Sequence, residues 1–321
     1  MHIASTRGWN RSRSAGVLTV VVRALCLLAL VGIVSTASAA SSPRLLARIP
    51  TGTAPCGAAG AFGAMWVAND GGTLVRINPG TNRVTRRVRV RRGACSVAVG
   101  AGAVWVTNYR RSAVLRVDPR SGRVRTIRVG AEPFDVLVAF GRIWATSWQT
   151  GTLVEIAPRS LRVVRRIKVG PYPAGLAARS GAVWVGFGRE ATAIVRVAPK
   201  AGSVERVPVG DARPSWFVAG TRELWIQAND HDLLHVDPST RRVLARIHVG
   251  RTLAQGAAAP DGTLWIPDKE QSVVYRIDPA TERVVDSFAA GPGAFVARHA
   301  FGSMWVTSYA GSDVWRFRPT G

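Results

Sequence analysis

A tryptophan recurs in this sequence at almost constant spacing, and that spacing most constrains the fold. Seven copies of one phrase, such as AVWVTN and SMWVTS, carry it. The tryptophans stand at positions 66, 105, 144, 184, 225, 265 and 305, which are 39, 39, 40, 41, 40 and 40 residues apart. A glycine precedes six of them by three residues, and only Arg222 departs from this column. A period of about 40 residues indicates a repeat architecture with one supersecondary unit per repeat.

Each repeat has the pattern of four short strands. In the second repeat we expect strands at residues 95–100, 103–108, 113–118 and 123–130. These runs are rich in β-branched and aromatic residues, and glycine, proline, asparagine and aspartate bound them. A proline turn, as at Asp118 and Pro119, ends the third strand because proline cannot continue a central strand. Four strands in about 40 residues is the pattern of one β-propeller blade.

The two ends of the repeat array indicate how the ring closes. The seventh repeat ends after its third strand, and a stretch that resembles a fourth strand, RLLARIPTG at 44–52, precedes the first repeat. An open ring would leave a sheet edge unpaired. We therefore predict an all-β fold over residues 41–321. It is a seven-bladed β-propeller with four antiparallel strands per blade, and its last blade is closed by the N-terminal strand, with Leu45 to Pro50 paired to Asp313 to Phe317.

Residues 1–40 have the pattern of a signal peptide. Arginines precede an apolar run at 24–34, and the small residues ASA at 37–39 follow it. The alternative is a retained membrane anchor beginning at Val17, with Arg23 inside it. After cleavage we expect no membrane span and a secreted or cell-envelope location, where disulfides form. Cys56 and Cys95 occupy the same position in neighbouring repeats, so we predict a disulfide between them, with two buried thiols as the alternative.

The phrase GAVWVTNYRRSAVLRVDPRSGRVRTIRVGAEP (102–133) resembles the extracytoplasmic YVTN-type propeller repeats, and its Gly-x-x-Trp strand is similar to that of the streptogramin B (virginiamycin B) lyases. The likeness covers almost all of the mature chain. The lyase resemblance implies a magnesium-assisted elimination that opens a cyclic depsipeptide ester, with His and Glu side chains on one face. The family's repeats carry a glutamate just after the second strand. The matching positions here are Asn69, Asn108, Ser147, Phe187, Ala228, Asp268 and Ser308, so no catalytic residue can be carried over.

Ligand-binding residues are expected at one mouth of the central channel. There the loops that join blades meet the loops between second and third strands. The candidates in these loops are Tyr109, Arg110, Phe134, Asp135, Trp148, Tyr172, Trp216 and Tyr309. Tyr109, Trp148 and Tyr309 share one column of the repeat and should ring the same face. Aromatic side chains interleaved with arginine suit a planar or sugar-like ligand or an anionic peptide. The alternative is that they only cap the apolar ends of the blades.

One acidic and imidazole cluster is a candidate metal site. Asp230 and His231 lie in the fifth repeat, and Asp268 and Glu270 lie at the matching place in the sixth. Oxygen ligands of this kind can hold Mg²⁺ or Ca²⁺, and a solvated acidic loop is the alternative. We find no HExxH, GxSxG, EF-hand or phosphate-loop motif. The sequence therefore assigns no cofactor beyond this candidate ion.

The chain is strongly basic, with a formal net charge of +24, and nearly all of the positive charge is arginine. Arginines crowd the fourth strands of the first three repeats. Such a stripe could bind an anionic envelope polymer, or it could only protect outer strands from aggregation. It lacks neighbouring aromatics for base stacking, so nucleic acid is not expected. We expect an extracytoplasmic binding or scaffold protein for a peptide, glycan or protein partner. A magnesium-dependent lyase or hydrolase and adhesion through the arginine rim are the alternatives.

Overall fold

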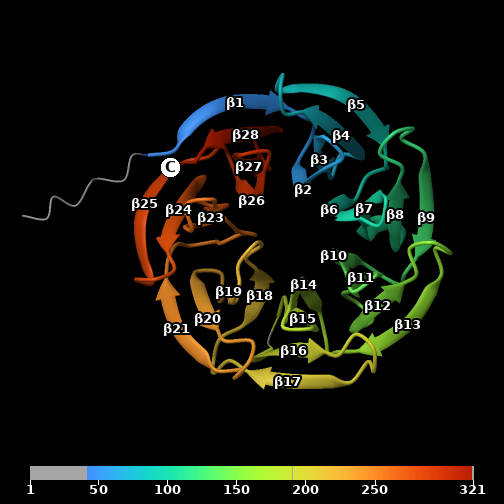
Figure 1. Cartoon of the computed structure of the whole chain (residues 1–321), viewed down its shortest axis with the longest axis vertical. Coiled ribbons are helices and arrows are strands. Elements are labelled where there is room, and N and C mark those ends of the chain that lie inside the picture. Colours follow the sequence, from blue (N-terminus) through green and yellow to red (C-terminus); the bar gives the residue numbers. More distant parts are fainter. Residues whose placement is uncertain (1–41, 190, 320–321) are drawn as a thin grey trace, which may run out of the picture. The chain divides into compact units, whose positions relative to one another are not determined.

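The computed structural model describes residues 42–189 and 191–319, and these residues form seven four-stranded antiparallel sheets around a central axis (Figure 1). Each sheet is one blade, and consecutive strands run from the channel outward in six of the seven. The fold class expected from the repeat is therefore confirmed. The seventh sheet has the order β1-β28-β27-β26, so its outer strand comes from the other end of the chain.

The strands are grouped here by blade. Blade 1 contains β2 (Pro55–Ala61), β3 (Ala64–Asn69), β4 (Thr73–Asn78) and β5 (Arg83–Arg89), and blade 2 contains β6 (Ala94–Gly100), β7 (Ala103–Asn108), β8 (Ala113–Val117) and β9 (Val124–Arg128). Blade 3 contains β10 (Pro133–Ala139), β11 (Arg142–Ser147), β12 (Thr152–Ile156) and β13 (Val163–Lys168), and blade 4 contains β14 (Pro173–Arg179), β15 (Ala182–Phe187), β16 (Ala193–Val197) and β17 (Val204–Pro208). Blade 5 contains β18 (Pro214–Phe217), β19 (Leu224–Ala228), β20 (Asp232–Val236) and β21 (Val243–His248), and blade 6 contains β22 (Ala257–Ala258), β23 (Leu264–Asp268), β24 (Val273–Asp278) and β25 (Arg283–Ala289). Blade 7 contains β26 (Ala294–Ala300), β27 (Ser303–Ser308), β28 (Asp313–Arg318) and β1 (Arg44–Pro50), and one short 3₁₀ helix, η1 (Tyr109–Arg111), follows β7.

The glycine column is explained by the hairpin between the first two strands of each blade. In blade 2 this turn is Ala101 and Gly102, with φ of 48° and 70°. Positive φ at both central residues matches a type I′ turn, whose twist fits a two-residue hairpin and which favours glycine. Blade 5 has Arg222 in this column, and its β18 to β19 connection is longer, with Gly220 at a φ of 83°.

The tryptophan column fills the space between blades. All seven repeat tryptophans are buried. The indole N–H of Trp105 donates to the carbonyl of Gly100 at 3.0 Å, and that of Trp305 donates to the carbonyl of Ala300 at 3.0 Å. In these two blades the tryptophan thus supplies a large apolar surface and also satisfies a carbonyl at the end of the innermost strand.

The predicted closure by the N-terminal strand is confirmed. Leu45 pairs with Phe317 and Pro50 pairs with Asp313 in the antiparallel ladder of β1 and β28. The N–H of Thr51 donates to the carbonyl of Ser312 at 3.1 Å. In blades 1 to 6 the corresponding bond joins the end of the fourth strand to the loop before the third strand of the same repeat. The terminal strand therefore takes the place of the fourth strand of an ordinary blade.

The predicted disulfide is also present. Cys56 in β2 and Cys95 in β6 are bonded, with their Cα atoms 4.8 Å apart, and they tie together the innermost strands of blades 1 and 2. The backbones approach closely there: a Cβ on Gly57 would lie 2.3 Å from the carbonyl oxygen of Cys95. The predicted signal peptide, residues 1–40, lies outside the described residues. The part of the chain that is described contains no helix long and apolar enough to cross a membrane.

Candidate binding site

The mouth face is the side of the ring that carries the loops after the second strands and after the fourth strands. Backbone hydrogen bonds join these two sets of loops. The N–H of Trp148 donates to the carbonyl of Glu132 at 3.0 Å, and the N–H of Gly188 donates to the carbonyl of Tyr172 at 3.0 Å. Tyr309 makes the same kind of bond to Gly293. The sequence columns therefore predict correctly which loops meet.

Four of the predicted aromatic residues form one continuous surface, here called the aromatic shelf: Phe134, Trp148, Tyr172 and Trp216. The ring of Phe134 lies 4.8 Å from that of Trp148 and 5.2 Å from that of Trp216, centroid to centroid. The ring of Trp148 lies 5.3 Å from that of Tyr172. All four side chains are half-buried and come from blades 3, 4 and 5. Contacts between the rings hold the shelf in place without hiding it from solvent.

A glycine and an arginine complete the shelf. A Cβ on Gly188 would lie 2.1 Å from the indole ring of Trp148, so only glycine lets the ring lie flat against this loop. The exposed guanidinium of Arg189 lies 5.3 Å from the ring centre of Tyr172 and 5.9 Å from that of Trp148. A cation over aromatic rings gives this surface an attraction for anionic groups as well as for apolar rings.

Tyr109 and Tyr309 lie elsewhere on the mouth face. The hydroxyl of Tyr109 donates to a carboxylate oxygen of Asp70 at 2.8 Å, and Tyr309 packs on Phe295 with ring centres 5.4 Å apart. Burial raises the pKa of Tyr309, and the charge of Asp70 adds to the shift. Among the described residues, no ring contact joins either tyrosine to the shelf, so the shared column produces two groups rather than one ring of aromatics.

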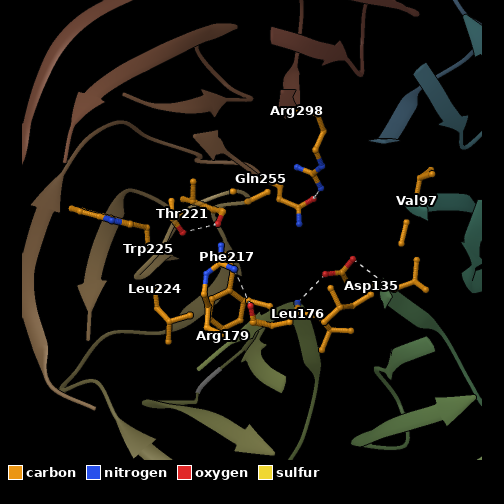
Figure 2. A pocket seen from close by; sticks show the side chains of 18 residues that line it. Val97, Asp135, Leu176, Arg179, Phe217, Thr221, Leu224, Trp225, Gln255 and Arg298 are labelled. Carbon is orange, nitrogen blue, oxygen red and sulfur yellow. Dashed lines mark hydrogen bonds between the residues drawn. The ribbon is translucent and has the colours of Figure 1, made fainter. Parts of the chain in front are cut away.

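The central channel holds Asp135 (Figure 2). Its carboxylate accepts hydrogen bonds from the hydroxyl of Ser96 at 2.5 Å and from the N–H of Leu176 at 2.8 Å. It therefore links blades 2, 3 and 4. Burial raises the pKa of Asp135, and these hydrogen bonds act in the opposite direction. This pattern indicates a structural role for Asp135, because its oxygens already have partners.

Asp135 shares the channel with two arginines. The guanidinium groups of Arg298 and Arg179 reach a cavity of ≈ 270 Å³, and Arg298 hydrogen-bonds to Gln255 (Figure 2). Burial lowers the pKa of Arg298 to about 10. Sequence reasoning missed Arg298, although a signal exists. In the ladders of blades 1 to 4 and 6, the first-strand residue paired with the repeat tryptophan is alanine or leucine, and in blade 7 it is this arginine.

The column that should carry glutamates in a lyase has a structural use here. The side-chain amide of Asn108 donates to the carbonyls of Val90 at 2.9 Å and Arg91 at 3.1 Å, and the hydroxyl of Ser147 donates to the carbonyl of Ala131 at 2.8 Å. These residues anchor the loop that arrives from the preceding blade. A small polar residue recurs at this position of the repeat, and that recurrence was the sequence signal for loop anchoring.

The four predicted metal ligands do not face one another. The carboxylate of Asp268 accepts hydrogen bonds from the N–H groups of Arg251, Thr252 and Gln271. Glu270 is exposed and contacts Arg251 and Thr252. His231 and Asp230 lie in the other blade, and His231 groups with Asp232 and His248 instead. Because backbone amides take both oxygens of Asp268, the predicted set does not fit a magnesium or calcium ion.

Charge is distributed very unevenly around the ring. Residues 55–130, which make blades 1 and 2, contain 14 arginines and only two acidic residues. Residues 211–290, which make blades 5 and 6, contain 11 acidic and nine basic residues. Within the described part of the chain, no ion pair shorter than 4.0 Å involves an arginine of blades 1 or 2. Five of these arginines, Arg89, Arg91, Arg92, Arg110 and Arg111, surround a hollow of ≈ 410 Å³ at the mouth-side edge and are here called the arginine cluster.

Comparison with known proteins supports the fold. The sequence matches no protein-family model and no curated protein. Its structure is similar to a catalytically inactive virginiamycin B lyase from Staphylococcus aureus with quinupristin, with a TM-score of 0.74 and 14% identity over 86% of this chain and 99% of that one. The selenomethionine-substituted virginiamycin B lyase from Staphylococcus aureus gives a TM-score of 0.73, with 13% identity over 86% and 99% of the two chains. Kuenenia stuttgartiensis hydrazine synthase gives a TM-score of 0.71, with 12% identity over 84% and 97%. These proteins carry different functions on a similar ring, so the likeness identifies the fold of this chain as a seven-bladed β-propeller and leaves its function to the site.

Proposed function

We propose that this chain is an extracytoplasmic binding protein that takes an anionic glycan polymer across its mouth face. The observation that carries the proposal is the presence of two complementary surfaces on one face. The aromatic shelf lies on blades 3 to 5, and the arginine cluster lies at the mouth-side edge of blades 1 and 2. Aromatic rings stack on the apolar faces of sugar rings, and guanidinium groups bind phosphate or carboxylate groups in pairs of hydrogen bonds.

The charge distribution favours a polymer over a small ligand. The unpaired arginines extend beyond the cluster onto the outer strand β9, where Arg125 and Arg128 are exposed. An extended polyanion can contact many of them at once and release its counterions, which a small anion cannot. The disulfide between Cys56 and Cys95 agrees with a location outside the cytoplasm, where such polymers occur.

A lyase related to the virginiamycin B enzymes is the alternative, and it rests on similarity of fold. The glutamate column of that family is filled here by residues such as Asn108 and Ser147, which anchor neighbouring loops. The predicted metal ligand Asp268 is likewise bonded to backbone amides. We therefore favour binding over catalysis.

Binding should be measured by calorimetry with three polymers: a purified teichoic acid, neutral dextran and inorganic polyphosphate. We expect the teichoic acid to bind most tightly, and its affinity should fall steeply as the salt concentration rises from low to physiological. Trp148→Ala should weaken binding about threefold to tenfold, the scale of one lost aromatic contact. Phe140→Ala is the control, because Phe140 is also an accessible aromatic residue but lies in a hairpin turn away from the mouth loops.

Two results would overturn the proposal. Failure of all three polymers to bind would contradict the proposal that the ligand is an anionic glycan polymer. Equal binding of polyphosphate and teichoic acid, with no effect of Trp148→Ala, would show that charge alone acts and that the shelf is not a ligand surface. Substitution of Arg110 and Arg111 by glutamine should weaken both anionic polymers, whereas Arg283→Gln in blade 6 should leave them unchanged.

A further inference from the structure

We propose that blade 5 carries a transition-metal site formed by His231, Asp232 and His248, suited to Zn²⁺ or Cu²⁺. This site is independent of the glycan proposal and shares only His231 with the four ligands expected from sequence. His231 lies in the loop after β19, Asp232 begins β20, and His248 ends β21. The antiparallel ladder places Asp232 directly opposite His248, so the backbone brings two of the three ligands together.

The distances between ligand atoms fit a tetrahedral metal ion. Nδ1 of His248 lies 3.3 Å from Oδ1 of Asp232, and Nε2 of His231 lies 3.8 Å from Oδ2 of the same carboxylate. One ligand atom from each of the three residues falls within 4.8 Å of the others. Tetrahedral zinc with bonds of about 2.0–2.1 Å holds its ligand atoms about 3.4 Å apart. The separation between Asp232 and His248 matches this spacing, the others are wider, up to 4.8 Å, and rotation of the exposed imidazoles is needed to close the site.

Hydrogen bonds already hold the carboxylate of Asp232 in an orientation that suits metal binding. Oδ2 of Asp232 accepts hydrogen bonds from Nε of Arg246 at 2.8 Å and from the side-chain amide of Asn229 at 3.2 Å. These donors fix the buried carboxylate and leave Oδ1 directed toward His248. Groups that bond the outer oxygen of a ligating carboxylate orient it and strengthen the site.

The local charge also favours a cation. The guanidinium of Arg246 is shared between Asp232 and Asp211, with Nη2 2.7 Å from Oδ2 of Asp232 and Nη1 2.7 Å from Oδ1 of Asp211. Two carboxylates therefore face one guanidinium. Blades 5 and 6 are the sector of the ring in which acidic residues outnumber basic ones. Two imidazoles and one carboxylate favour zinc or copper over magnesium or calcium, which prefer an all-oxygen set.

Titration calorimetry of the full chain with Zn²⁺ alone, without a histidine tag, tests the site. We expect one equivalent of Zn²⁺ to bind, and His248→Ala and His231→Ala should each weaken that binding about tenfold or more. Loss of a residue that only hydrogen-bonds to a metal ligand already lowers metal affinity about tenfold, and loss of a ligand should cost at least as much. His299→Ala in blade 7 is the matched control, because it removes an exposed histidine far along the chain from this cluster. Co²⁺ should give the strong visible absorption of a tetrahedral site, and this absorption should disappear in His248→Ala.

The histidine variants should fold normally, because the side chains of His231 and His248 are 42% and 73% exposed. Their melting temperatures without metal are the check. Absence of Zn²⁺ binding by the wild-type chain would overturn the proposal. Binding that survives in both histidine variants, or that is lost equally in His299→Ala, would also overturn it.

Discussion

Replacement of Ile49 by alanine is the sharpest test of ring closure. Ile49 lies in the terminal strand β1, is 3% exposed and packs at the seam between blades 7 and 1 against a cluster that includes Met65, Trp305 and Val314. The change removes three buried carbon atoms at about 0.8 kcal/mol each, or roughly 2.4 kcal/mol. The cavity left in a rigid seam raises the expected loss of unfolding free energy to about 3–4 kcal/mol.

Leu45→Ala is the matched control on the same strand. Leu45 is 37% exposed, so the loss should stay below about 1 kcal/mol. For a chain of this size, each kcal/mol lost from the free energy of unfolding lowers the melting temperature by about 2 °C. Ile49→Ala should therefore melt about 6–8 °C lower than the wild type when unfolding is followed by circular dichroism. Equal melting temperatures for the two variants would refute the reasoning, because the terminal strand would then not be part of the cooperative ring.

Three further predictions follow from individual residues. Asn108→Ala should cost about 1–3 kcal/mol in guanidinium unfolding, because it leaves the buried carbonyl of Val90 and the partly buried carbonyl of Arg91 without their donor; an unchanged midpoint would contradict the loop-anchoring function. Reduction of the Cys56–Cys95 disulfide should lower stability by about 2–4 kcal/mol, measured by melting with and without reductant, and the double Cys→Ala variant should be insensitive to reductant. The raised pKa of Asp135 means that the folded chain holds the carboxyl proton to higher pH than the unfolded chain does. The contribution of Asp135 to folding stability is therefore largest below its pKa in the unfolded chain, and it is lost as the pH rises through its pKa in the folded chain. Asp135→Asn should therefore flatten the decline of stability with rising pH in denaturant titrations, and an identical slope in both proteins would contradict the raised pKa.

Much of the architecture could be predicted from the repeat columns. In a ring of equivalent blades, equal positions in the repeat become equivalent positions in space. The columns therefore predicted the pairing of β1 with β28 and the contact between Cys56 and Cys95. The same logic correctly assigned which loops meet at the mouth. It gave no information on side-chain direction, and Tyr109 turns to Asp70 whereas Trp148, from the same column, packs against Phe134.

The sequence alone determined the number of blades, the strand order and the closing strand, because these depend on spacing and on the need to pair every sheet edge. Only the tertiary structure decided which polar groups act together. Asp268 turned inward to backbone amides, while the register of β20 and β21 placed Asp232 opposite His248. The first contact depends on a rotamer and the second on the exact strand register, and the repeat spacing alone encodes neither.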